Sequence, residues 1–156
     1  MMTTNPLVAK PGPTANNERM NQPTLPIFVY GTLKRGEQRE RCWPHSPLKV
    51  ESATTRGRLF KLDDYPAMIP GDDLILGELW TIHSEHLSET LRVLDAIEWF
   101  GQDDVDLYAR VIVECRGATG DLQRAYTYYY AAPEELPAQR RILPDSNGIC
   151  SWTAHR

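Results

Sequence analysis

The residues best suited to chemistry in this sequence begin in a segment where a short apolar run meets a glycine turn. Residues 27–30 (Ile, Phe, Val, Tyr) are β-branched or aromatic and favour a buried strand, and Gly31 follows where the chain must turn. Thr32 and Leu33 continue the turn, and the backbone N–H groups freed there can receive an anion. The same pattern also fits an ordinary buried strand that ends in a tight loop.

The second candidate is a lone carboxylate, Glu98. Leu87, Leu91 and Leu94 recur at the spacing of one helical face, and the next position on that face is Glu98. Apolar neighbours and the negative end of the helix dipole both oppose ionisation. We therefore expect a pKa raised toward neutrality, as a group that both accepts and donates a proton requires. Alternatively, the helix ends earlier and Glu98 faces solvent or pairs with Arg110.

Two further candidates share one face of an expected strand over residues 107–115. Period-two alternation places Tyr108 and Arg110 on the same side. A phenol and a guanidinium there could orient a substrate carboxylate or Glu98 itself, although a surface cross-strand pair explains them equally well. The adjacent acidic pairs elsewhere fall in turn-like segments and are given no catalytic role: Asp63-Asp64, Asp72-Asp73 and Asp103-Asp104.

The elements that must position these residues are one helix and several short strands. The helix is expected from Ser84 to about Ile97, with Ser84 as its N-cap. A short helix or irregular excursion is expected around residues 38–42. Many short strands around one long helix predict an α+β fold with a small, curved, barrel-like sheet. Besides the strands at 27–30 and 107–115, the expected strands are 54–62, 65–69, 74–82 and 122–131.

Composition limits the classes of function. The chain has 156 residues and a formal net charge of -4, which suits one domain and gives no general attraction to nucleic acid or anionic membranes. Its three cysteines form no CxxC pair and have no histidine at ligand spacing, so neither a disulfide framework nor a metal site is expected. No leader pattern and no membrane-spanning apolar run are found. A cytoplasmic location is expected.

The domain organisation is expected to be a single folded unit between two tails. Residues 1–24 are rich in proline and asparagine and poor in large apolar groups, which predicts a flexible N-terminal tail. Residues 25–137 form the domain. Residues 138–156 form a C-terminal tail that either covers one end of the barrel or packs outside it.

Five segments occur in an order that carries a resemblance to a known family. They are Val29–Gly36, Tyr65–Gly71, Leu76–Trp80, Leu94–Glu98 and Tyr108–Arg110. Over roughly residues 26–131 the chain resembles the gamma-glutamylcyclotransferase-like family, in particular its gamma-glutamylamine cyclotransferase branch. The resemblance implies a small mixed, mainly antiparallel β-barrel with flanking helices.

The resemblance also implies a reaction. The α-amine of a gamma-glutamyl amine or amide would attack its own γ-carbonyl, giving 5-oxoproline and a free amine, with Glu98 as general acid/base and without metal or organic cofactor. A departure is Trp99, at a position that is often glycine in the family, so the leaving amine stays open. The residues that would bind this small-molecule substrate are Tyr30, Gly31, Thr32 and Leu33, mainly through backbone amides, with Tyr108 and Arg110 as further candidates.

Two other functions remain compatible with these residues. Glu98 could instead activate water for amide hydrolysis, which would release glutamate. The domain could also be a noncatalytic binding or interaction module that keeps the barrel and the anion-binding loop. A retained acid such as Glu98 favours an enzyme, because a pocket that only binds has no need of a proton carrier. The oligomeric state is not indicated by the sequence.

Overall fold

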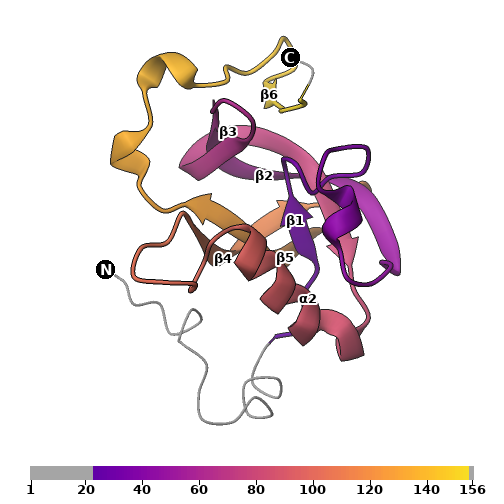
Figure 1. Cartoon of the computed structure of the whole chain (residues 1–156). Coiled ribbons are helices and arrows are strands. Elements are labelled where there is room, and N and C mark those ends of the chain that lie inside the picture. Colours follow the sequence, from indigo (N-terminus) through magenta and orange to yellow (C-terminus); the bar gives the residue numbers. More distant parts are fainter. Residues whose placement is uncertain (1–22, 155–156) are drawn as a thin grey trace.

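The computed structural model describes residues 23–154, and Figure 1 shows a β-barrel with one long helix packed against it. Nearly all of the expected N-terminal tail, residues 1–22, lies outside the described residues. The strands are β1 (Ile27–Val29), β2 (Lys49–Lys61), β3 (Pro66–Thr81), β4 (Tyr108–Arg116), β5 (Leu122–Tyr130) and β6 (Ile149–Cys150). The helices are α2 (Ser84–Ile97) and the 3-10 turns η2 (Glu40–Cys42), η3 (Pro133–Glu135) and η4 (Ala138–Arg140).

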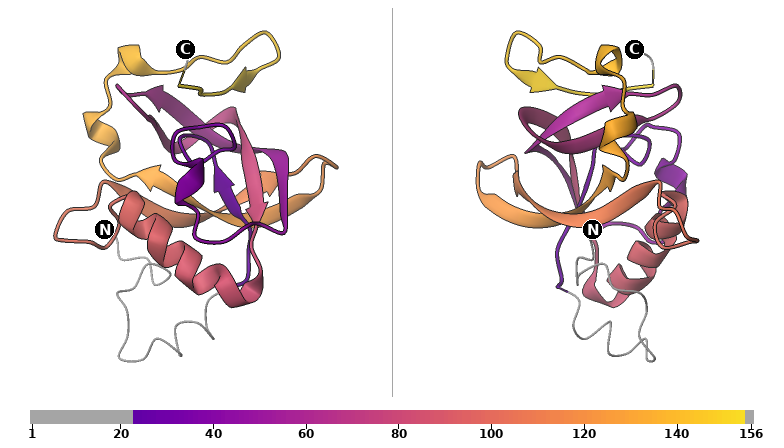
Figure 2. Two further views of the ribbon diagram at one scale, coloured as in Figure 1. Left: turned by 45° about the vertical axis from the view of Figure 1, so that its right-hand side comes forward. Right: turned by 90° about the vertical axis from the view of Figure 1, so that its left-hand side faces the viewer.

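Five strands close the barrel in the order β1-β5-β4-β2-β3, and β1 returns to pair with β3. The β1–β5 pairing is parallel, whereas β1–β3, β2–β3, β2–β4 and β4–β5 are antiparallel. Figure 2 shows the curved strands wrapping around a common interior with α2 along one side. The expected α+β fold with a small mixed, mainly antiparallel barrel is confirmed. Among the described residues no helix is both long and apolar enough to cross a bilayer.

The strand β3 runs through a segment where the sequence predicts a break. Pro70, Gly71 and Asp72 were expected to form a turn between two strands, but the pairing with β2 resumes across them after a register shift at Gly57/Arg58. A Cβ on Gly71 would lie 2.9 Å from backbone atoms of Gly57, so the close approach of the two strands requires glycine. The predicted turn is therefore a bulge in one long strand.

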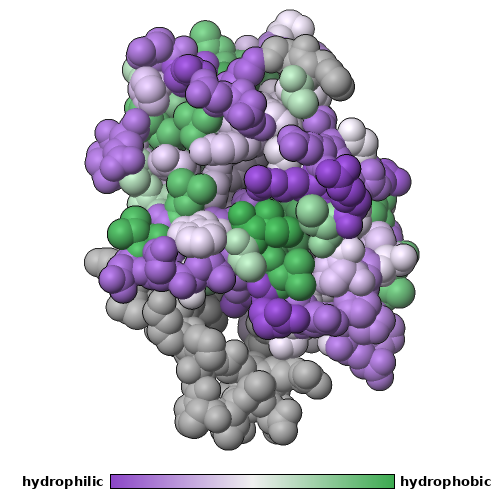
Figure 3. Space-filling view, in the orientation of Figure 1, coloured by the Kyte–Doolittle hydropathy of each residue, from purple (hydrophilic) through white to green (hydrophobic). Residues whose placement is uncertain are grey.

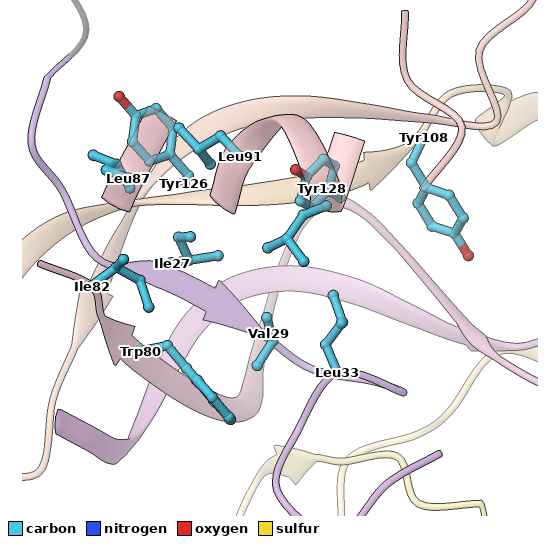
Figure 4. Packing of buried hydrophobic residues seen from close by; sticks show 11 residues of the cluster. Ile27, Val29, Leu33, Trp80, Ile82, Leu87, Leu91, Tyr108, Tyr126 and Tyr128 are labelled. Carbon is cyan, nitrogen blue, oxygen red and sulfur yellow. The ribbon is translucent and has the colours of Figure 1, made fainter. Parts of the chain in front are cut away.

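The helix α2 has the expected span but a different N-cap. His83 occupies the N-cap position and its ring Nδ1 accepts a hydrogen bond from the amide of Glu85 at 3.1 Å, while Ser84 is already helical. The apolar stripe is confirmed, because Leu87, Leu91 and Leu94 are buried. Figure 4 shows Leu87 and Leu91 directed into the same core as the side chains of β1 and β5.

The C-terminal segment packs against the other side of the barrel. Its short strand β6 pairs in parallel with β3, through Leu74 with Ile149 and Ile75 with Cys150. Trp152 is 3% exposed and joins a second core cluster that includes Phe28 and Tyr30. The surface seen in Figure 3 is mainly hydrophilic, with an apolar patch beside the C-terminal end of α2. Residues at that end of α2 line the cavity described below.

Candidate active site

A cavity lies where β1 ends, between the loop that follows β1 and the C-terminus of α2. Its empty volume is about 560 Å³ when the open mouth is included, within the usual range for small-molecule sites. The fold brings most of the residues singled out in the sequence to its wall. These are Tyr30, Gly31, Thr32, Leu33, Glu98 and Tyr108.

The loop after β1 holds its carbonyl groups in internal hydrogen bonds and leaves amides unused. The carbonyl oxygens of Gly31 and Thr32 accept from the amides of Lys34, at 3.1 Å, and Arg39, at 2.8 Å. Leu33 O accepts a hydrogen bond from the indole N–H of Trp43 at 3.0 Å. Within residues 23–154, no protein group accepts a hydrogen bond from the amides of Gly31, Thr32 or Leu33. Three amides of cavity-lining residues are thus available for an anion or a developing oxyanion.

The loop after β1 packs closely against Pro66 at Gly31. A Cβ on Gly31 would meet Cγ of Pro66 at 2.6 Å, so this position requires glycine. The carbonyl of Pro66 accepts from the hydroxyl of Tyr108 at 2.6 Å, and the hydroxyl of Tyr30 donates to the carbonyl of Tyr128 at 2.6 Å. Burial raises the pKa of both donor tyrosines. Their phenols therefore stay protonated near neutral pH and shape the cavity.

Glu98 is the acidic residue in this cavity. Its backbone ends α2, with its amide donating to Leu94 O at 2.9 Å, and only 14% of its side chain is exposed. Burial is the largest effect and raises the pKa of Glu98 to about 7, while Arg39 lowers it and Asp95 raises it. The expected direction is confirmed. The alternative pairing with Arg110 is not observed, because the cationic partner is Arg39 at 3.9 Å.

The backbone after Glu98 takes a left-handed turn without glycine. Trp99 has φ of 57°, and the amides of Trp99 and Phe100 bond back to Ala96 O, at 3.3 Å, and Asp95 O, at 2.8 Å. This is a Schellman ending, in which glycine usually occupies the position of Trp99. The helix α2 thus ends at Ile97 with Glu98 as its C-cap, and Glu98 lines the cavity.

Comparison with known proteins assigns the family. Residues 27–151 match the family described as "Gamma-glutamyl cyclotransferase, AIG2-like". The chain belongs to this family. It is 31% identical over 114 residues to "Gamma-L-glutamyl-butirosin B gamma-glutamyl cyclotransferase" of Niallia circulans, covering 70% of this chain and 69% of the relative. It is 32% identical over 126 residues to a "Putative gamma-glutamylcyclotransferase" of Vibrio cholerae, covering 80% and 94% respectively.

Solved structures support the same fold for this gamma-glutamyl cyclotransferase family member. A mouse AIG2-like protein superposes with a TM-score of 0.52 at 24% identity, covering 85% of this chain and 97% of its own. YkqA of Bacillus subtilis superposes with a TM-score of 0.54 at 24% identity, covering 69% of this chain. This chain spans only 36% of the length of YkqA. At these identities the likeness establishes the barrel architecture.

In this family member Arg110 lies beside the cavity instead of lining it. Its Nη1 pairs with Oδ2 of Asp95 at 3.1 Å, and the hydroxyl of Tyr128 donates to Oδ1 of the same carboxylate at 2.7 Å. Tyr108, on the same strand, does line the cavity. Arg110 is therefore placed to act on the site through Asp95, three residues before Glu98 on α2.

Sequence reasoning missed two charged residues near Glu98. Asp95 precedes Glu98 by one helical turn, so helical spacing could have identified it. Arg39 follows a loop without periodicity, and no signal in the sequence links it to Glu98.

Within residues 23–154, no group of three or more His, Cys, Asp or Glu side chains is arranged to hold a metal ion.

Proposed function

We propose that this protein converts a gamma-glutamyl amine or amide into 5-oxoproline and a free amine, with Glu98 as general acid/base. The observation that carries the proposal is a largely buried carboxylate with a pKa of about 7 in the same cavity as three unused backbone amides. Family membership supports cyclotransferase chemistry. The relative named for gamma-L-glutamyl-butirosin B supports a gamma-glutamyl substrate.

The reaction needs little from the protein beyond positioning and proton transfer. The nucleophile is the substrate's own α-amine, and the cavity must fold the glutamyl chain so that this amine approaches the γ-carbonyl carbon. The amides of Gly31, Thr32 and Leu33 would bind the glutamyl group at its carboxylate. None of the described residues that line the cavity is a serine or cysteine, which agrees with a substrate that supplies the nucleophile.

Glu98 would transfer two protons in succession from the α-nitrogen to the leaving nitrogen. In its ionised form it takes a proton from the α-ammonium group, and the freed amine forms the new C–N bond that closes the five-membered ring. The protonated Glu98 then gives this proton to the leaving nitrogen as the original amide bond breaks. The carboxylate formed again takes the surplus proton from the new ring nitrogen and passes it to the released amine, which leaves as an ammonium ion. A carboxyl with a pKa of about 7 exchanges a proton readily in both directions near neutral pH.

The test is detection of 5-oxoproline by mass spectrometry after incubation with gamma-glutamyl amines, amino acids and peptides. Glu98→Gln keeps the shape of the side chain but cannot accept the proton, so we expect a loss of about 10²-fold or more in kcat/KM. The matched control is Glu89→Gln, which removes an exposed carboxylate from the same helix, outside the cavity. It should retain full activity.

Two other outcomes would indicate a different function. Glutamate in place of 5-oxoproline would show hydrolysis with Glu98 activating water. Binding of a gamma-glutamyl ligand by both the parent and Glu98→Gln, with turnover by neither, would show a noncatalytic binding module.

A further inference from the structure

Arg39 is a charged residue of the cavity that the proposed reaction leaves without a substrate partner. Among the described lining residues it is the one with a cationic side chain. Its Nη1 lies 3.9 Å from Oε2 of Glu98. The Arg39 side chain is 40% exposed, against 14% for Glu98, so Arg39 is the more solvent-accessible member of the pair.

The position of Arg39 is tied to the loop that supplies the free amides. Its own amide donates to Thr32 O at 2.8 Å. The indole of Trp43 donates to Leu33 O at 3.0 Å and stacks on Trp80 with ring centroids 4.1 Å apart, which anchors the far side of this loop. The three amides and Arg39 therefore belong to one anchored segment, so a group bound by the amides would lie at a fixed distance from Arg39.

The proposed proton transfer to Glu98 leaves Arg39 without a charged partner in the cavity. Glu98 is the counter-ion of Arg39 only while it is ionised, and it becomes neutral when it accepts the proton of the α-ammonium group. In the proposed function the α-carboxylate of the glutamyl group is bound by the amides of the loop, so it is not the partner of Arg39. A second anion on the substrate would restore a partner for Arg39 at that stage.

The leaving side of the substrate can supply this anion. The leaving nitrogen must approach Glu98 within hydrogen-bond distance to receive its proton, and the guanidinium of Arg39 lies next to that carboxyl group. A carboxylate separated from the nitrogen by a single carbon atom therefore falls within reach of Arg39. A neutral amine makes no such contact, and a second cationic group on the amine would be repelled.

We infer that Arg39 is a specificity determinant that selects leaving amines carrying a carboxylate next to the reacting nitrogen, as in a gamma-glutamyl α-amino acid. This inference rests on the proposed cyclotransferase function. It places recognition of the leaving group on a residue outside the five motif segments that carry the family resemblance.

The test compares two substrates that differ only in this charge, gamma-glutamyl-alanine and gamma-glutamyl-alaninamide. The parent should favour the carboxylate substrate in kcat/KM by about 10- to 100-fold, the usual range for a charge-assisted hydrogen bond. Arg39→Gln should bring the ratio close to one, and Arg39→Lys should restore part of it. The ratio is the informative quantity, because both substrates depend on Glu98 and any change in the Glu98 pKa affects them alike.

The matched control is Arg41→Gln, which removes an exposed arginine of η2 that does not line the cavity, and it should keep the parental ratio. Equal kcat/KM for the two substrates in the parent, or an unchanged ratio in Arg39→Gln, would overturn the inference while leaving the cyclotransferase function intact. Absence of 5-oxoproline from both substrates, and from the wider substrate pool, would instead overturn the proposed function and this inference with it.

Discussion

Glu98 is held in a balance between burial and one nearby cation. Burial favours its neutral form and Arg39 favours its charged form, with burial the larger effect, so that the pKa settles at about 7. A carboxyl group placed this way has a cost to folding at neutral pH. The unfolded chain ionises Glu98 freely, whereas the native protein must ionise it in a largely apolar wall.

Glu98→Gln should therefore change how stability depends on pH. The pKa of Glu98 rises from 4.5 to about 7 on folding, so the native state binds more protons between these values and its stability falls as pH rises through them. The full difference amounts to about 3 kcal/mol. Urea unfolding at about pH 4 and pH 8 should show the variant gaining stability over the parent at the higher pH. Parallel pH dependence in the two proteins would contradict the shift.

The sequence identified the parts of the site that depend on local pattern. Glu98 was found because it interrupts an apolar helical stripe, and Gly31 because a glycine follows a buried strand. Arg39 and the Asp95–Arg110 pair were not found because their partners come from distant segments joined only by the fold. Arg110 was correctly placed on the face of Tyr108, but strand alternation cannot tell how far along that face the cavity extends.

At the scale of elements, α2 and β4 are joined beside the cavity by a largely buried ion pair. The side chains of Arg110 and Asp95 are 14% and 18% exposed, and Tyr128 of β5 donates to the same carboxylate. The guanidinium also lies over the ring of Tyr126, 5.5 Å from its centroid. This contact fixes the last turn of α2, and therefore Glu98, against the barrel.

Asp95→Asn should lower the pH at which activity is half-maximal. The parent needs ionised Glu98, so its kcat/KM should fall as pH drops below about 7. Removing the Asp95 charge takes away an effect that raises the Glu98 pKa, and Arg110 is left without its carboxylate partner, so the midpoint should move to lower pH. Breaking this pair should also cost about 3 kcal/mol of stability. A pH–rate profile and urea unfolding measure the two effects.

Asp104→Asn is the control, because it removes an exposed carboxylate from the loop between α2 and β4 and should leave the midpoint unchanged. Arg39→Gln should move the midpoint in the opposite direction to Asp95→Asn, since Arg39 lowers the Glu98 pKa. Midpoints that move together in Asp95→Asn and Arg39→Gln would argue against Glu98 as the titrating group.

Most strands were predictable because their apolar alternation is local. The strands β4 and β5 begin and end within one residue of the expected ranges. The strand β2 begins at Lys49, earlier than the expected Thr54, because its first residues are largely polar and are recruited by pairing with the end of β3. Such pairing at a barrel rim depends on the partner strand, so the segment's own composition does not reveal it.

At the scale of the whole molecule, the C-terminal segment links the barrel to the loop that follows β1. Arg141 pairs with Asp73 of β3 at 2.9 Å, and the amide of Ile142 donates to Leu59 O at 2.8 Å. The side-chain nitrogen of Lys34 then donates to Trp152 O at 2.6 Å. Lys34 directly follows Gly31, Thr32 and Leu33, whose amides have no acceptor among the described residues. The hydrogen bond to Trp152 O therefore restrains the conformation of this loop.

Two variants separate the packing of this segment from its contact with the loop. Trp152→Ala opens a cavity in the second core and should lower the free energy of unfolding by about 3–5 kcal/mol. Lys34→Met keeps the aliphatic stem but loses the hydrogen bond to Trp152 O, so it should raise KM for a gamma-glutamyl substrate with a much smaller loss of stability. Urea unfolding and steady-state kinetics on both variants would distinguish these effects. An unchanged KM in Lys34→Met would mean that the loop keeps its conformation without the chain end, and that the C-terminal segment acts on stability alone.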